Sequence, residues 1–188
     1  MDALVSAFVA AALAEWGDKT QLIVALLAAR YGRPGPVLAG FALAALLSSV
    51  AAAIGGVIVG NLITIRAMTM MVALALLFAG IAGLLRKKAP GVSGGWPGGP
   101  FVAAAALCLV AEFGDRTQFL TFAIAGRFDS AALAAAGATA GLLTAGIPAA
   151  LLANRLQSVV PVKAIRYVVA GLFLVTGSIV AVNALQLA

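Results

Sequence analysis

Six long apolar stretches, separated by short polar breaks, dominate this sequence of 188 residues. They cover residues 3–29, 36–59, 65–85, 101–125, 130–152 and 162–185. Each reaches the length of roughly 20 residues that a helix needs to cross a bilayer. Hydrophobic residues make up 64% of the chain and charged residues 10%, whereas a soluble domain is about half apolar and a quarter charged. We therefore expect an all-α integral membrane protein whose six transmembrane helices lie in a lipid bilayer.

The two halves of the chain repeat each other. The segment AEWGDKTQLIVALLAARY at residues 14–31 returns as AEFGDRTQFLTFAIAGRF at residues 111–128, shifted by 97 residues without a gap. The same shift pairs Gly40 with Gly137 in later helices. Because the match extends over a whole motif and its flanking helix, we interpret the chain as a duplicated three-helix unit.

An odd number of helices in each unit requires the second unit to enter the membrane from the side opposite to the first. The expected fold class is therefore two inverted three-helix repeats, an architecture that secondary transporters use. The first repeat spans residues 1–85 and the second spans 101–188. A basic linker rich in glycine and proline, residues 86–100, joins them.

Basic residues outside the repeated motifs predict the orientation in the membrane. One face carries only Arg66 and Arg127. The other face carries Arg30, Arg33, Arg86, Lys87, Lys88, Arg155, Lys163 and Arg166. Because cytoplasmic loops of membrane proteins are enriched in lysine and arginine, we expect both termini outside and the linker in the cytoplasm. Bases placed between apolar stretches also explain the net charge of +6 without a nucleic-acid partner.

Four of the six acidic residues lie inside apolar stretches, in two copies of one motif. Glu15 and Asp18 are spaced i, i+3, which would place both carboxylates on one face of a helix. Glu112 and Asp115 are their counterparts, and antiparallel packing of the first and fourth helices would bring the two motifs together at the midplane. Because an uncompensated carboxylate in hydrocarbon is costly, such residues indicate a functional site.

Further motif residues accompany the acids. Gly17 and Gly114 would let the helices approach closely, or let them unwind and offer carbonyl oxygens. Lys19 and Arg116 follow the glutamates with the favourable i, i+4 spacing, and we interpret them equally as gating residues or as structural counter-charges. Neutral oxygens would come from Thr20, Gln21, Thr117 and Gln118.

A chamber lined by these oxygens suits a hard divalent cation, because Ca²⁺ and Mn²⁺ prefer carboxylate, carbonyl and water ligands. The chain has no histidine and one cysteine, so zinc and copper are not expected. Four ionised acids and two charged bases leave the site with a net charge of −2, which one divalent cation or two protons neutralise. Since clustered carboxylates repel one another, protons can compete for them. The charge count therefore indicates an antiporter site.

The paired motifs, EWGDKT at residues 15–20 and EFGDRT at 112–117, resemble the Glu-x-Gly-Asp-Lys/Arg-Ser/Thr signature of a cation–proton antiporter family. That family includes the Golgi manganese/calcium transporter and bacterial manganese exporters. The resemblance covers the architecture of nearly the whole chain. It implies exchange of Mn²⁺ or Ca²⁺ for protons, with the four motif carboxylates as metal ligands and proton carriers.

By the same resemblance, the motif threonines and glutamines support the metal site. The short central loop and compact, alanine-rich chain look bacterial, and the family's usual task in bacteria is manganese export. We therefore expect a transporter of the bacterial cytoplasmic (inner) membrane that is not an enzyme. Its substrates would be a divalent cation and protons, with no cofactor beyond the transported ion.

Two other interpretations stay open. An intramembrane aspartyl protease also needs two membrane-embedded aspartates, and Asp18 and Asp115 are candidates. The glutamates and bases would have no role in such a protease, and the chain lacks its Gly-x-Gly-Asp pattern. A structural membrane subunit would use the motifs only as ion pairs that fix helix register. Duplication of the whole acidic motif favours transport over both.

Overall fold

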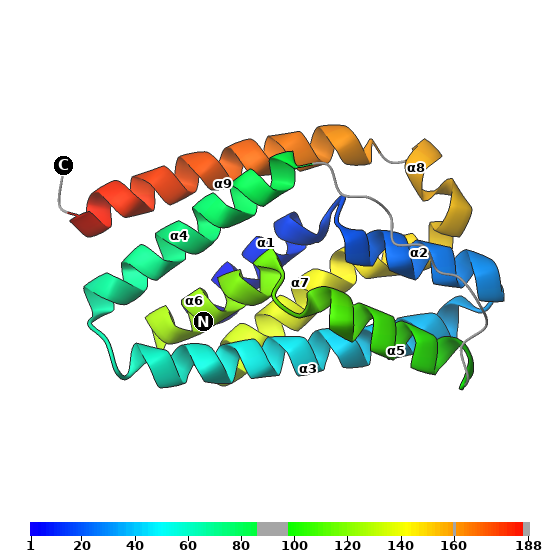
Figure 1. Cartoon of the computed structure of the whole chain (residues 1–188), viewed down its shortest axis with the longest axis horizontal. Coiled ribbons are helices and arrows are strands. Elements are labelled where there is room, and N and C mark those ends of the chain that lie inside the picture. Colours follow the sequence, from blue (N-terminus) through cyan, green and yellow to red (C-terminus); the bar gives the residue numbers. More distant parts are fainter. Residues whose placement is uncertain (86–97, 160, 186–188) are drawn as a thin grey trace.

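The computed structural model describes residues 1–85, 98–159 and 161–185, and these residues are helical apart from short connections (Figure 1). Most of the predicted linker, residues 86–97, lies outside the described residues. The helices are α1 (Asp2–Glu15), α2 (Lys19–Tyr31), α3 (Pro34–Gly60), α4 (Ile65–Leu84), α5 (Gly99–Glu112), α6 (Arg116–Phe128), α7 (Ala131–Leu152), α8 (Leu156–Val159) and α9 (Val162–Leu185), with a 3-10 turn, η1 (Ala153–Arg155).

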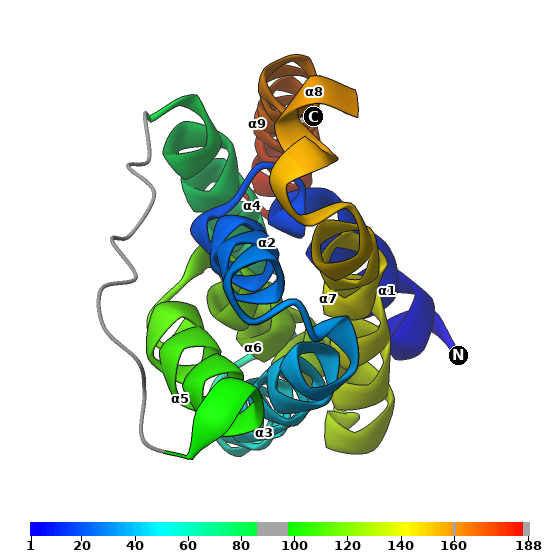
Figure 2. The same ribbon diagram turned by 90° about the vertical axis from the view of Figure 1, so that its right-hand side faces the viewer.

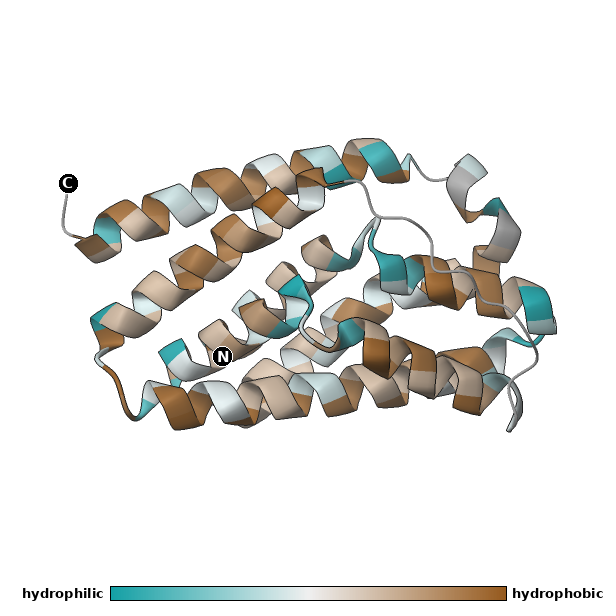
Figure 3. Cartoon of the chain, viewed as in Figure 1, coloured by the Kyte–Doolittle hydropathy of each residue, from teal (hydrophilic) through white to brown (hydrophobic). Residues whose placement is uncertain are grey.

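Four helices, α3, α4, α7 and α9, are long and apolar enough to cross a bilayer, and α5 is a shorter apolar helix. Their bounds lie within two residues of four predicted spans. Large apolar side chains such as Leu47, Ile58 and Val175 remain exposed on the outside of the bundle. Figure 3 shows hydrophobic residues along the whole length of these helices. A bilayer is the solvent that such a surface requires, so the chain is a multi-pass membrane protein.

The predicted spans at residues 3–29 and 101–125 are wrong as continuous helices. The first is broken between α1 and α2 and the second between α5 and α6, at the same place in each motif. Gly17 and Gly114 have φ angles of 79° and 72°, a left-handed conformation that glycine adopts without the steric penalty of other residues. Of the two roles predicted for these glycines, unwinding of the helix is therefore the one observed at both motifs.

The two broken segments are antiparallel. In Figure 1, α1 and α2 run from left to right, whereas α5 and α6 run from right to left. α1 packs against α6 and α2 packs against α5, and the long helices α3 and α7 flank both segments. In the end-on view of Figure 2, α2 and α6 lie near the centre of the bundle. The acidic residues of both motifs are thereby buried in the bundle.

Equivalent residues of the two halves make equivalent contacts. Gly40 of α3 lies so close to the carbonyl group of Phe101 in α5 that a methyl group at this position would clash with it. Gly137 of α7 lies in the same way against the carbonyl group of Leu4 in α1. Both partners, like both glycines, are 97 residues apart in the sequence. Small residues at these crossings allow the close backbone approach by which membrane helices associate.

The apolar interior consists of two clusters of buried side chains. One joins α1 and α6 to α3, α4, α7 and α9, and the other joins α2 and α5 to α3 and α7. Because α1 and α2 belong to different clusters, as do α5 and α6, each motif lies where the chain passes from one cluster to the other. The polar residues of the motifs are therefore enclosed between two hydrocarbon-like regions.

Candidate functional site

Buried polar side chains are concentrated at and beside the two motif breaks, where Figure 3 shows hydrophilic residues inside the bundle. The buried polar and charged residues are Glu15, Asp18, Thr20, Gln21, Ser48, Ser49, Glu112, Asp115, Arg116, Thr117 and Thr121. Most of the predicted site residues are in this group. Lys19 and Gln118 are partly buried and lie beside it.

A glutamine holds each break in place. The Gln21 Oε1 atom accepts a hydrogen bond of 2.9 Å from the backbone N–H of Gly17. The Gln118 Oε1 atom accepts the equivalent bond, of 2.8 Å, from the N–H of Gly114. Such an N–H has no intrahelical partner once the helix is broken. The amide oxygens predicted to face a metal are thus each engaged by the backbone of their own motif.

The glutamines also connect each break to the opposite repeat. Gln21 Nε2 donates to the carbonyl oxygen of Ala145 in α7 at 3.3 Å. Gln118 Nε2 donates to the hydroxyl of Ser48 in α3 at 3.4 Å. Positions 48 and 145 are also counterparts under the 97-residue shift. Ser48 is not among the predicted site residues, and its one sequence signal is its place beside Ser49 in the middle of an apolar stretch.

The carboxylates of one motif do not share a helical face. Glu15 is the last residue of α1, whereas Asp18 is the N-cap of α2 beyond the break. Glu112 and Asp115 stand in the same relation at α5 and α6. The predicted i, i+3 face is wrong because it assumed an unbroken helix. Each motif instead presents the carbonyl end of one half-helix and the N–H end of the next.

The bases pair across the repeats. The Nζ atom of Lys19 lies 3.2 Å from Oδ1 of Asp115, and the Nη2 atom of Arg116 lies 3.4 Å from Oδ1 of Asp18. The i, i+4 spacing of each base from the glutamate of its own motif therefore does not give the ion pair that it favours in a helix, because the break interrupts the helical register on which that spacing depends. The observed pairs tie the first motif to the second.

Arg116 is the more deeply placed of the two bases. Its side chain is 3% exposed, compared with 30% for Lys19. The guanidinium also donates to the carbonyl oxygen of Ala14 in the last turn of α1. It packs against Gly83 of α4, where an added Cβ atom would lie 3.2 Å from Nη1. Since the end of α1 carries partial negative charge, Arg116 occupies an electronegative position.

The glutamate carboxylates are buried without hydrogen-bond partners. Within the described residues, no oxygen of the Glu15 or Glu112 carboxylate is hydrogen-bonded, and neither residue is more than 1% exposed. The hydroxyls of Thr20 and Thr117 are likewise buried and unpartnered within these ranges. Thr20 lies near Glu112, but outside hydrogen-bond geometry. A buried carboxylate in this position is stable only when it holds a proton or a cation.

The four acids interact electrostatically with one another, but they are not arranged as one ligand set. In the part of the chain that the structure describes, no three carboxylate or thiol side chains are grouped to hold a metal ion. Asp18 and Asp115 are each drawn towards a base of the opposite motif. Lys19 and Arg116 therefore lie where a cation bound by the aspartates would also lie.

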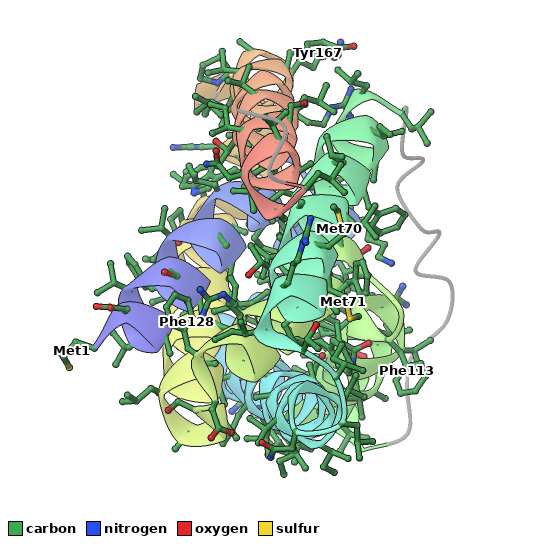
Figure 4. The ribbon with its side chains drawn as sticks, turned by 90° about the vertical axis from the view of Figure 1, so that its left-hand side faces the viewer. Met1, Met70, Met71, Phe113, Phe128 and Tyr167 are labelled. Carbon is green, nitrogen blue, oxygen red and sulfur yellow. The ribbon has the colours of Figure 1, made fainter. Side chains whose placement is uncertain are left out.

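The second motif faces a cavity. This cavity, of about 550 Å³, is lined by Asp115, Gln118 and Gly114 together with residues of α3, α4 and α6. A Cβ atom added at Gly114 would meet no neighbouring atom within 4 Å. Phe113, also at the cavity, is 78% exposed and projects at the outer edge of the bundle (Figure 4). Asp115 therefore borders a cavity whose other walls are mostly apolar.

The first motif is covered instead. The first turn of α9 lies over Gly17, where an added Cβ atom would be 3.0 Å from Val162 and 3.3 Å from Arg166. Asp18 is fully buried. Two motifs of nearly identical sequence therefore differ in access, and the covering turn of α9 is a part of the site that sequence reasoning missed.

Comparison with known proteins finds the same duplication that the sequence shows. The family model described as "Divalent cation/proton antiporter GDT1" matches the chain twice, over residues 3–90 and 100–187. A protein of Vibrio cholerae serotype O1 named "Putative manganese exporter" is 35% identical over 177 residues, which cover 93% of this chain and 88% of that protein. No solved structure matches the chain. The family consists of transporters rather than enzymes, and this chain belongs to the GDT1 family of divalent cation/proton antiporters.

Proposed function

We propose that this protein exports Mn²⁺ from the cytoplasm in exchange for protons, with Glu15, Asp18, Glu112 and Asp115 as the exchange site. The observation that carries the proposal is the pair of buried glutamate carboxylates without hydrogen-bond partners. Because these carboxylates need a bound proton or a bound cation, the site is suited to exchange a proton for a cation. The family supports cation/proton exchange, and the name of the Vibrio relative supports Mn²⁺ over Ca²⁺.

The charges of the site set the stoichiometry that we propose. Four carboxylates with Lys19 and Arg116 give a net charge of −2, so one divalent cation or two protons restore neutrality. The buried hydroxyls of Thr20 and Thr117 are available as neutral ligands. Each glutamine oxygen already accepts one backbone hydrogen bond and has a second lone pair left. We assign the glutamines mainly to holding the breaks.

The architecture we propose has six crossings, in which α1 with α2 and α5 with α6 each form one interrupted crossing. Contacts that recur between equivalent residues of the two halves support an inverted repeat. Gly80 of α4 lies against Leu174 of α9, and Gly177 of α9 lies against Leu77 of α4, with both pairs of counterparts 97 residues apart. Interrupted helices near the membrane midplane present backbone dipoles to ions in secondary transporters.

The orientation we propose places both termini outside the bacterial cytoplasmic (inner) membrane. Residues 32–33 and 129–130 connect helices at opposite ends of the bundle (Figure 1). In a Cys108→Ala background, Arg33→Cys should react with a membrane-impermeant maleimide only after the cells are permeabilised, whereas Asp129→Cys should react in intact cells. The reverse pattern would contradict the orientation, and labelling of both from one side would contradict the inverted arrangement.

Reconstitution of the purified protein tests the exchange reaction. Liposomes that contain a pH-sensitive dye should show proton movement opposite to an imposed Mn²⁺ gradient, a smaller response to Ca²⁺ and none to Zn²⁺. Protein-free liposomes and the double variant Glu15→Gln/Glu112→Gln are the controls. Mn²⁺ flux without counter-movement of protons would contradict antiport, and absence of any divalent-cation flux would contradict the proposal as a whole.

A further inference from the structure

We propose that Arg116 and Lys19 are tethered competitors of the transported cation. Each base holds the aspartate of the opposite motif while the site carries protons, and leaves it when the metal binds. This inference rests on the proposed function and assigns these two residues a specific part in it: they set how tightly the metal is held and how readily it is released.

The surroundings of Arg116 are those of a cation site. Its guanidinium contacts the carboxylate of Asp18 and the carbonyl oxygen of Ala14. Carboxylate and carbonyl oxygens are the ligands that a hard cation prefers, and here they lie at the negative end of the half-helix α1. The side chain of Arg116 thus fills a position that is built for positive charge.

Lys19 is the counterpart of Arg116 under the 97-residue shift, and it contacts Asp115 in the same crosswise manner. The two pairs differ in access, because Asp115 lines the 550 Å³ cavity whereas Asp18 is fully buried. A cation that arrives through this cavity meets the pair of Lys19 and Asp115 first. The compact ammonium group of Lys19 contacts the carboxylate of Asp115, whereas the guanidinium of Arg116 contacts both Asp18 and the carbonyl oxygen of Ala14.

A tethered base makes it easier for the metal to leave the site. Four carboxylates that bind a divalent cation tightly would hold it, because its departure leaves their charges uncompensated in a low-dielectric interior. A base on the same chain is always present at high effective concentration. It returns to its aspartate as the metal leaves, so the emptied site keeps two of its four negative charges neutralised. The bases therefore lower the affinity for the metal and raise the rate of release.

Binding of Mn²⁺ to the purified full-length protein, measured by isothermal titration calorimetry, tests the inference. Arg116→Gln removes the competitor, so the dissociation constant should fall by about tenfold or more, as expected for loss of one charge-assisted contact. Mn²⁺ release from preloaded proteoliposomes should slow correspondingly. Lys19→Gln should show the same changes to a smaller extent, because its pair is partly exposed. Arg116→Lys, which keeps the charge but cannot make both contacts of the guanidinium, should restore the dissociation constant in part.

The matched control is Arg155→Gln, which removes an exposed base of η1 and should leave both measurements unchanged. Unchanged or weaker Mn²⁺ binding by folded, monodisperse Arg116→Gln and Lys19→Gln would overturn the inference, because a purely structural ion pair predicts a loss of affinity. If Arg116→Gln does not fold, the Mn²⁺ affinity of Lys19→Gln, whose side chain is more exposed, decides whether the inference holds. Failure of the wild type to bind or transport Mn²⁺ and Ca²⁺ would instead overturn the proposed function, and this inference with it.

Discussion

Replacement of Glu15 or Glu112 by glutamine should abolish Mn²⁺ transport while the protein still folds and inserts into the membrane. Glutamine matches the volume of glutamate, but it neither carries the charge nor exchanges the proton. The carboxylates make no hydrogen bond among the described residues, so the substitution removes no structural contact. Since changes beside a metal ligand already reduce metal affinity or activity by about 10–100-fold, loss of a ligand should reduce transport by at least about 100-fold.

The aspartates should respond differently from the glutamates. Asp18→Asn should also abolish transport, but it leaves the guanidinium of Arg116 buried without its carboxylate. Removal of one partner of a buried ion pair costs about 3–5 kcal/mol, so this variant should be markedly less stable. Asp115→Asn should lose less stability, because the ammonium group of Lys19 is partly exposed.

These variants are compared by Mn²⁺ efflux from cells, with membrane abundance and thermal unfolding of the purified proteins measured in parallel. Asp129→Asn is the matched control, because it neutralises an acid outside the motifs at a left-handed position that asparagine also tolerates. Near wild-type Mn²⁺ efflux by two or more of the four motif variants would contradict their role as metal ligands and would indicate that the acids only form structural ion pairs. Equal destabilisation of the glutamine and asparagine variants would contradict the crosswise pairing.

The four uninterrupted spans could be predicted from the sequence because polar residues, bases or helix breakers, such as Asn61, Ser130 and Pro161, interrupt the apolar sequence between them. The two breaks were harder to predict, because each motif lies inside a longer, mainly apolar stretch that can be interpreted as one continuous helix. A signal was nevertheless present. Asp18 and Asp115 are residues that favour the N-cap of a new helix, and each directly follows the glycine.

The crosswise ion pairs and the unequal access of the motifs could not be predicted in the same way. The spacing of residues within one motif does not predict the ion pair between Arg116 and Asp18, because this pair depends on how the two antiparallel segments pack. The unequal access has its origin outside the motifs. Residues 61–64 join α3 to α4, whereas the longer segment 153–161 joins α7 to α9. The first turn of α9 is therefore free to lie over Gly17 in a position that α4 does not take at Gly114.

Transport should be insensitive to the membrane potential. If a site of net charge −2 carries one divalent cation outward and two protons inward, each cycle moves no net charge. The potential acts only on net charge moved, at about 2.3 kcal/mol per charge per 100 mV, so it cannot drive or oppose an electroneutral cycle. The pH gradient and the metal gradient are then the only driving forces.

Proteoliposomes with Mn²⁺ in the lumen separate these driving forces. For molecules oriented with their cytoplasmic face inward, an acidic outside medium should support export of Mn²⁺, and clamping the potential with potassium and valinomycin should change the rate little. Nigericin, which collapses the pH gradient, should stop uphill movement. A rate that rises steeply with imposed potential would require a different number of protons per cation. Such a number could arise if the acids bind one or three protons, or if Lys19 or Arg116 is uncharged during part of the cycle, because the −2 count depends on both bases keeping their charge. The measurement therefore tests the number of protons exchanged for each cation.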